Sequence, residues 1–395
     1  MGRNQGRNGR CGAFALLLVL LLALPAWAGK PEVSYEVVIA ESRPYVAVVS
    51  CESSGFSGDE LSLSLAPRYG WIQDFWTNLY ELSVTQDGRS LPVVKENVNT
   101  WEVRDLKPGR VLIRYSVGVP PRRWPRGGNV HERSVLTRYD GFFTGHALFL
   151  TPNLPALTAH VRISVPKGWE IASSWGEGTG PWLVRSRREL VSSYVTMGAC
   201  RVYHTKGEGV SYTLAIGGAW KFQDRDLLEL VRKIGDHYTK TLGEAPDERV
   251  FVVCRPGPTG SLAGSALDRS FYILLDPEMD LTLSSLPSSD VPSLLAHEMF
   301  HTWTRKLTPR VGDDTLAWFH EGFTNFAAAR ALLDTKLMSR KAYYSMMAGY
   351  WLKVRENPII ENDSGYRRRR ECRETGGKPL AEPWPKVRGP FTERN

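Results

Sequence analysis

The segment His297-Glu298-Met299-Phe300-His301 brings two imidazoles and a carboxylate into five consecutive residues. On an α-helix, residues four apart share a face, with their Cβ atoms about 5–6 Å apart. Tetrahedral zinc, with Zn–N near 2.1 Å, needs two nitrogens roughly 3.4 Å apart, which His297 and His301 reach by leaning together. Glu298 is rotated about 100° around the helix, so it stands beside the ion without ligating it. The spacing predicts two zinc ligands and a general base for hydrolysis.

A second helical segment offers a third ligand for the same ion. Glu321 lies twenty positions after His301, beyond one connecting loop. An anionic ligand there completes a His₂Glu set and leaves a fourth position for water, an arrangement typical of catalytic zinc. Asn325 follows one turn later on the same face, where it can hold a ligating histidine from behind. His320 points about 100° away from Glu321 and is predicted not to share the ion.

The helix that carries His297 is predicted to span Asp290–Lys306, with Asp290 at its cap and Pro292 in its first turn. Its interior is apolar on most sides, and such a helix is buried. Buried ionisable groups cost several kcal/mol unless they are paired or bound to metal. The alternative hypothesis is a pair of core histidines with a capping glutamate, and the position of Glu321 weakens it.

Several further elements must position these residues. The patterns predict helices at Asp224–Leu242, Asp314–Asp334 and Arg340–Arg355, and buried strands at Val250–Val253 and Phe271–Leu275. Between the two strands we expect a loop containing Gly257, Gly260 and Gly264. Because Phe271–Leu275 precedes the zinc helix, we expect this strand to pair with an extended substrate.

The chain changes character near residue 220. Before it, short segments alternate apolar with polar residues between turn signals, as half-buried antiparallel strands do. These predicted strands are Val33–Ile39, Tyr45–Cys51, Leu61–Leu65, Arg110–Val117, His160–Val165 and Val210–Ile216. We therefore predict an α+β protein, with a β-sandwich-like domain at residues 29–220 followed by a mainly helical domain at 221–360.

Composition and charge limit the possible partners. Of 395 residues, 42% are hydrophobic and 23% charged, which excludes a disordered, collagen-like or coiled-coil protein. The formal charge is +8, but basic residues concentrate at the two ends and the middle of the chain is near neutral. The basic segment Pro121–Gly128 has no second basic stripe beside it. No nucleic-acid partner is predicted.

The amino terminus is predicted to be an export signal. Residues 1–28 combine three arginines, the twelve-residue apolar run Ala13–Leu24 and an Ala-Trp-Ala cleavage site at 26–28. The run is short for a membrane span, which needs about 20 residues. We expect a periplasmic or secreted protein with no stable membrane span, the alternative being an uncleaved signal anchor. Four cysteines would remain after cleavage, and Cys200 and Cys254 are predicted to be buried thiols.

Two motifs carry a family resemblance: His297-Glu298-x-x-His301-x-Trp303 and Trp318-Phe319-x-Glu321-Gly322-x-Thr324. They resemble those of the glycyl aminopeptidase family of gluzincin metallopeptidases, over roughly residues 30–355. The resemblance implies a thermolysin-like zinc peptidase domain with one Zn²⁺ per chain. It also implies His297, His301 and Glu321 as ligands and Glu298 as the base.

The chain departs from that family in two places. The family's Gly-Gly-Leu-Glu-His-like stretch, which recognises the substrate amino terminus, corresponds here to residues 264–270, and Asp268 is the candidate replacement for its glutamate. The family usually continues into a longer helical region, whereas residues 361–395 are polar, rich in Gly and Pro, and predicted to be disordered. The transition-state side chain is left open among Tyr343, Tyr344, Tyr350 and Tyr366.

The sequence thus predicts an exported zinc metallopeptidase that acts on peptides or proteins, and the resemblance implies an aminopeptidase. Endopeptidase action remains open, because the family's glutamate is replaced at Asp268. The alternative hypothesis is an exported peptide- or protein-binding module whose peptidase domain is degenerate.

Overall fold

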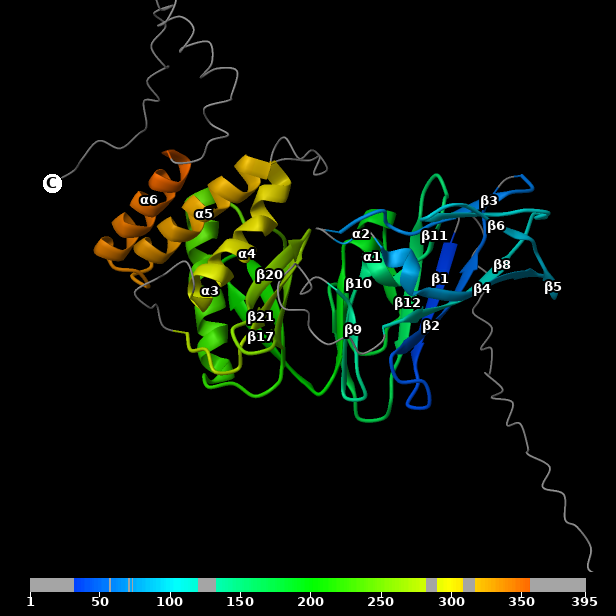
Figure 1. Ribbon diagram of the computed structural model, residues 1–395, viewed down its shortest axis with the longest axis horizontal. Coiled ribbons are helices and arrows are strands. Elements are labelled where there is room, and N and C mark those ends of the chain that lie inside the picture. The colour runs from blue at the N-terminus through cyan, green and yellow to red at the C-terminus, as the bar shows by residue number, and fades with distance from the viewer. Residues whose placement is uncertain are drawn as a thin grey trace, which may run out of the picture.

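Strands dominate the first half of the chain and helices the second, as the sequence predicts (Figure 1). The computed structural model describes residues 32–56, 58–69, 72, 74–119, 133–281, 290–307 and 317–355. The predicted export signal at 1–28 and the predicted disordered tail at 361–395 lie outside these residues. We call residues 32–198 the amino-terminal lobe and residues 200–355 the carboxy-terminal lobe.

Three sheets build the amino-terminal lobe. The largest has the strand order β15 (Trp182–Val184), β12 (Thr158–Ser164), β1 (Glu32–Ile39), β2 (Val46–Ser53), β8 (Val111–Gly118), β4 (Leu79–Gln86) and β5 (Arg89–Ser90). The second has the order β14 (Gly176–Glu177), β13 (Glu170–Ser173), β16 (Tyr194–Gly198), β10 (Asp140–Thr144) and β9 (Val135–Leu136). The third has the order β11 (Thr151–Pro152), β3 (Leu61–Ser64), β7 (Thr100–Val103) and β6 (Val93–Asn97).

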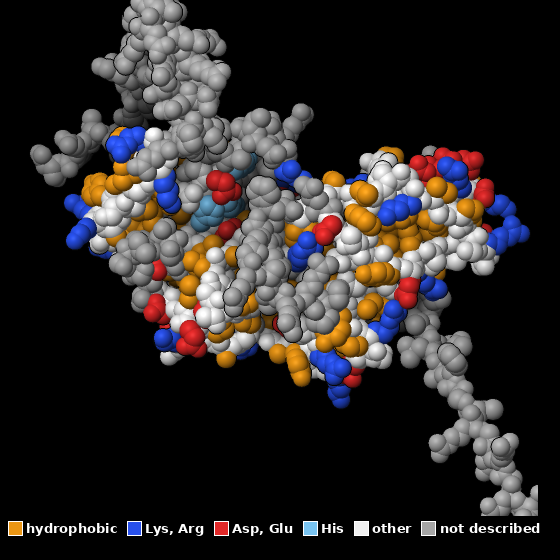
Figure 2. Space-filling view, in the orientation of Figure 1, with side chains coloured by type: hydrophobic (Ala, Val, Ile, Leu, Met, Phe, Trp, Pro, Cys, Tyr) orange, Lys and Arg blue, Asp and Glu red, His pale blue; other side chains and the backbone are white. Residues whose placement is uncertain are grey.

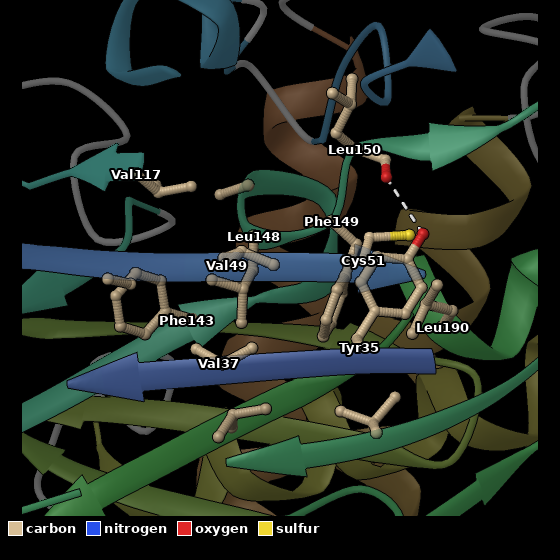
Figure 3. Packing of buried hydrophobic residues seen from close by; sticks show 14 of the residues in the cluster. Tyr35, Val37, Val49, Cys51, Val117, Phe143, Leu148, Phe149, Leu150 and Leu190 are labelled. Carbon is tan, nitrogen blue, oxygen red and sulfur yellow. Dashed lines mark hydrogen bonds between the residues drawn. The ribbon is translucent and has the colours of Figure 1, made fainter. Parts of the chain in front are cut away.

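Alternation of buried and half-buried residues fixes the register of these sheets. In β2 every second side chain is buried, and its partners β1 and β8 run antiparallel to it on both sides. Between the sheets, the buried Tyr35 hydroxyl donates to the Leu150 carbonyl at 3.0 Å, beside the Cys51 side chain (Figure 3). The short helices α1 (Gly145–Leu148) and α2 (Arg187–Val191) and the 3-10 turn η1 (Phe75–Asn78) complete the lobe.

The carboxy-terminal lobe has its own five-stranded mixed sheet, in the order β17 (Cys200–Gly207), β18 (Val210–Gly217), β19 (Arg249–Pro256), β21 (Ser270–Leu275) and β20 (Leu262–Leu267). The helix α3 (Asp224–Leu242) connects the parallel strands β18 and β19. The structure thus differs from the boundary placed at residue 220, because the segment predicted at Val210–Ile216 pairs with β19 and belongs to the second sheet.

The strand β20 was not predicted from the sequence. Its residues were expected to form a glycine-containing loop, but they pair antiparallel with β21 from Leu262 to Leu267. The strand β21 itself lies between β19 and β20, so both of its edges are occupied. The prediction that a substrate pairs with Phe271–Leu275 is therefore wrong, and β20 is the edge strand on this side of the sheet, with β17 at the opposite edge.

The helices α4 (Val291–Leu307), α5 (Ala317–Asp334) and α6 (Arg340–Arg355) agree closely with the predicted ranges. As expected, α4 is buried: it packs against α3, α5, β20 and β21. Tyr238 of α3 donates to the Ala296 carbonyl at 2.9 Å, and Trp303 Nε1 donates to the Glu244 carbonyl at 3.0 Å. These bonds fix α4 immediately before and after its histidines.

The cysteines within the described residues do not form disulfides. Cys51, Cys200 and Cys254 are all buried free thiols, as predicted for Cys200 and Cys254. None of the helices described by the structure is both long and apolar enough to cross a membrane.

Candidate metal centre

Two neighbouring helices bring His297, His301 and Glu321 together. The His297 and His301 Nε2 atoms are 3.1 Å apart, and each faces a Glu321 oxygen, at 3.3 Å from His297 and 3.8 Å from His301. One donor atom from each residue lies within 4.8 Å of the other two. Figure 2 shows histidine and acidic side chains side by side in a hollow of the carboxy-terminal lobe.

This donor set fits a zinc ion. Tetrahedral coordination at about 2.1 Å requires ligand atoms roughly 3.4 Å apart, close to the three separations found. Two imidazole nitrogens and one carboxylate form a common catalytic zinc set. The histidine side chains are only 17% and 15% exposed, whereas Glu321 is 61% exposed, so the cluster opens to solvent on its carboxylate side. His320 is not part of the group.

Asn325 lies behind His297. Its Oδ1 atom is 3.0 Å from His297 Nδ1, and an amide oxygen can only accept. The hydrogen bond therefore places a proton on Nδ1, so the nitrogen available to a metal is Nε2, which faces Glu321 and His301. This tautomer is the one that a metal ligand needs.

The charges of the three donor side chains affect one another's pKa values. The hydrogen bond to His297 lowers the pKa of Glu321 against the opposing effect of burial. Burial lowers the pKa of His297, but the hydrogen bond to Glu321 and the charges of Glu298 and Glu321 outweigh it, so the net pKa is raised. Both shifts favour a protonated imidazole paired with an ionised carboxylate, and a bound cation would take the place of that proton.

Glu298 is buried, with 6% of its surface exposed, and it lies against Gly264 of the edge strand β20. A Cβ atom added to Gly264 would approach Glu298 Cγ to 2.5 Å, Cδ to 2.8 Å and Oε1 to 2.9 Å. Only glycine fits here with the carboxylate in its present position. From the sequence, Gly264 is assigned only to a loop and to the stretch 264–270, and the signal for its position is a run of small residues between two strand-like segments.

A cavity of about 220 Å³ adjoins these residues. His297, Glu298 and Asn325 line it together with apolar side chains from four elements. Its other lining residues are Leu262, Ser293, Leu294, Ala328, Ala329, Met346 and Tyr350. Tyr350 is thus placed at this cavity, whereas Tyr344 is 66% exposed and Tyr366 lies outside the described residues.

Asp268 is not brought to the donor cluster. It lies in the turn between β20 and β21, where its two oxygens accept from Arg188 Nε at 2.6 Å and from an Arg188 terminal nitrogen at 2.8 Å. Both residues line a second cavity, of about 230 Å³, at the junction of the lobes. This partner lies eighty positions away in the sequence, so no local pattern could reveal it.

Comparison with known proteins places the first part of the chain beside a known domain. Residues 34–198 match the Peptidase M61 N-terminal domain. No match was found among curated proteins. The resemblance to glycyl aminopeptidases in particular stays a prediction.

Solved structures share the fold at low sequence identity. An aminopeptidase N family protein from Idiomarina loihiensis is 19% identical with a TM-score of 0.68, over 79% of this chain and 56% of that chain. An M1 zinc metallopeptidase from Deinococcus radiodurans is 14% identical with a TM-score of 0.52, over 83% and 75% of the two chains. A mutant of such a Deinococcus radiodurans metallopeptidase bound to a Tyr-Ser-Ala substrate is 15% identical with a TM-score of 0.53, over the same shares. The chain therefore spans little more than half the length of the Idiomarina protein.

Proposed function

We propose that this chain is an exported zinc metallopeptidase that hydrolyses peptide bonds. The observation that carries the proposal is the convergence of His297, His301 and Glu321 beside the buried carboxylate of Glu298. The M61 domain match and the fold shared with M1 metallopeptidases support it. Export rests on the sequence of residues 1–28 alone.

Each residue of the centre has a distinct task. His297, His301 and Glu321 would hold one zinc ion, and Asn325 would fix the His297 ring. When bound, zinc lowers the pKa of a water ligand toward about 7 and polarises the scissile carbonyl. The Glu298 carboxylate takes a proton from the attacking water and delivers it to the amine nitrogen as the C–N bond breaks. Burial of Glu298 against Gly264 keeps bulk water from competing for that proton.

The edge strand and the adjoining cavity would bind the substrate. In the described residues β20 pairs only with β21, so the part of its other edge that precedes Ser265 can add an extended peptide by main-chain hydrogen bonds. The cavity beside His297 joins the polar groups of the centre to apolar side chains, among them Leu262, Leu294 and Met346. We infer a preference for an apolar side chain next to the scissile bond.

Aminopeptidase specificity is a narrower proposal, because such an enzyme must bind a free amine. The shared fold with an aminopeptidase N family protein supports it, but Asp268, the predicted anchor, already pairs with Arg188. Matched peptides with free and acetylated amino termini distinguish the two modes. Loss of cleavage on acetylation would indicate an aminopeptidase, and equal cleavage an endopeptidase in which Asp268 is no anchor.

The proposed function is tested with the purified full chain and a peptide library read by mass spectrometry. We expect one zinc per chain, cleavage next to apolar side chains, loss of cleavage with a zinc chelator and recovery when zinc is restored. Stoichiometric zinc without cleavage of any peptide would contradict the proposal and favour the alternative, a binding module with a degenerate peptidase domain.

Replacing Gly264 by alanine should displace the base without touching a metal ligand. The added Cβ must push the Glu298 side chain, since it would lie 2.5 Å from Cγ, and a misplacement of this order costs about 100-fold in rate. We expect that loss in kcat/KM with zinc content unchanged. Gly349→Ala is the control, because nothing lies within 4 Å of a Cβ at that position. Wild-type activity in Gly264→Ala would refute the packing role of this glycine.

A further inference from the structure

The edge strand β20 lies between helix α4, which carries His297 and His301, and the amino-terminal lobe. Successive residues of a strand point to opposite faces, and here Gly264 faces Glu298 of α4 while Ser265 faces the tyrosines of the other lobe. Figure 1 shows β20 near the junction of the two lobes. Ser265 and Gly264 are consecutive residues of β20, so a contact that fixes Ser265 also fixes the main chain that packs against Glu298.

Two phenol groups of the amino-terminal lobe bind Ser265. The Tyr69 hydroxyl is hydrogen-bonded to Ser265 Oγ at 2.6 Å, and the Tyr194 hydroxyl donates to the Ser265 carbonyl at 3.2 Å. The two phenols are also hydrogen-bonded to each other. One network thus holds both the side chain and the main chain of Ser265.

The phenols themselves are rigidly placed. Tyr194 is fully buried and Tyr69 is 7% exposed. The Tyr69 ring stacks on His146 with centroids 4.9 Å apart, and the Tyr194 ring meets Tyr272 edge-on at 5.4 Å. Burial raises the pKa of Tyr194 well above its usual value, so its hydroxyl keeps the proton that it donates to Ser265.

Further contacts hold the other end of the β20–β21 hairpin. The Ser174 hydroxyl is hydrogen-bonded to the Ser270 hydroxyl at 3.1 Å, and Arg188 of α2 forms the two-pronged ion pair with Asp268. The core of the amino-terminal lobe continues into the second lobe, since its cluster of buried hydrophobic residues includes Leu267 and Tyr272. The hairpin is thus anchored by the lobe that carries none of the zinc-centre residues.

We propose that Tyr69 and Tyr194 are positioning residues that fix the place of the edge strand β20 beside the catalytic base Glu298. This inference rests on the proposed peptidase function. Because β20 has only one neighbour among the described strands, its position depends on the bonds made by its other groups. Loss of the phenol hydroxyls removes the bonds that fix Ser265, so the strand can shift and Gly264 changes its position relative to Glu298.

The test uses Tyr69→Phe and Tyr194→Phe in the full chain, each of which removes one hydroxyl and keeps the ring. We expect kcat to fall about ten-fold, as for a small misplacement of reacting groups, with KM little changed and zinc content at the wild-type level. Amide hydrogen exchange in residues 262–267 should become faster, because exchange reports local opening. Ser265→Ala should add nothing to the loss in Tyr69→Phe, since both remove the same bond.

Tyr35→Phe is the matched control, because Tyr35 is also buried and donates to a main-chain carbonyl, that of Leu150. It should lower the unfolding midpoint but leave kcat and exchange at 262–267 unchanged. Unchanged exchange at 262–267 in both test variants would overturn the inference, as would a kcat equal to that of Tyr35→Phe. If the wild-type chain cleaves no peptide, the proposed function fails, while the exchange result still decides whether the hydroxyls hold the strand.

Discussion

Replacing Glu298 by glutamine is expected to abolish nearly all peptide hydrolysis while zinc stays bound. Glutamine has almost the same shape, so it fits the space beside Gly264, but its amide cannot accept a proton from water. General-base catalysis contributes about 10²–10⁴-fold to such reactions, and we expect kcat/KM to fall by that factor. Hydrolysis of the best library peptide and the zinc content of the same sample give the measurement.

The control for this variant is Glu229→Gln, which makes the same chemical change on the exposed face of α3. The Glu229 carboxylate lies 3.9 Å from Arg225 and its side chain is 67% exposed, so hydrolysis should be unaffected. If Glu298→Gln retained full activity with zinc bound, Glu298 would not be the base. If it lost its zinc, the side chain would be supporting the metal site and its catalytic role would have to be re-examined.

The donor cluster could be predicted from sequence because its geometry is local. His297 and His301 are fixed by the pitch of one helix, and the buried character of that helix is visible in its apolar residues. The position of Asn325 against His297 follows from the one-turn spacing to Glu321. Helix α4 begins and ends within a residue of the predicted range.

The surroundings of the cluster could not be predicted because they depend on long-range pairing. Small residues between Leu262 and Leu267 show neither strong alternation nor high hydrophobicity, so only the contact with β21 makes them a strand. The same pairing turns β21 from an edge into an interior strand. The ion pair of Asp268 with Arg188 and the bonds of Tyr69 to Ser265 join residues eighty or more positions apart.

These long-range contacts change the role of the amino-terminal lobe. From sequence it was a separate β-rich domain with no assigned part in the chemistry. In the structure its core continues into the second lobe, and its side chains bind the hairpin that packs on the base. The two lobes therefore form one structural unit, which agrees with fold likenesses to the Idiomarina and Deinococcus proteins that extend over 79% or more of this chain.

Replacing Glu321 by alanine is expected to remove zinc as well as activity, in contrast to Glu298→Gln. Glu321 supplies the only anionic donor in the cluster, and its loss leaves two imidazoles. Since altering an outer-shell partner already costs about 10–100-fold in metal affinity, we expect a larger loss here. The measurements are zinc content after dialysis and a chelator-competition dissociation constant.

Thermal unfolding provides a readout of this prediction that does not depend on turnover. A ligand that binds only the folded state raises its stability, so zinc should raise the unfolding midpoint of the wild-type chain and of Glu298→Gln. It should leave that of Glu321→Ala nearly unchanged. The control is His320→Ala, which alters the preceding residue of the same helix and should bind zinc as the wild type does. Normal zinc affinity in Glu321→Ala, or loss of zinc in His320→Ala, would show that the ion is held by a different set of side chains.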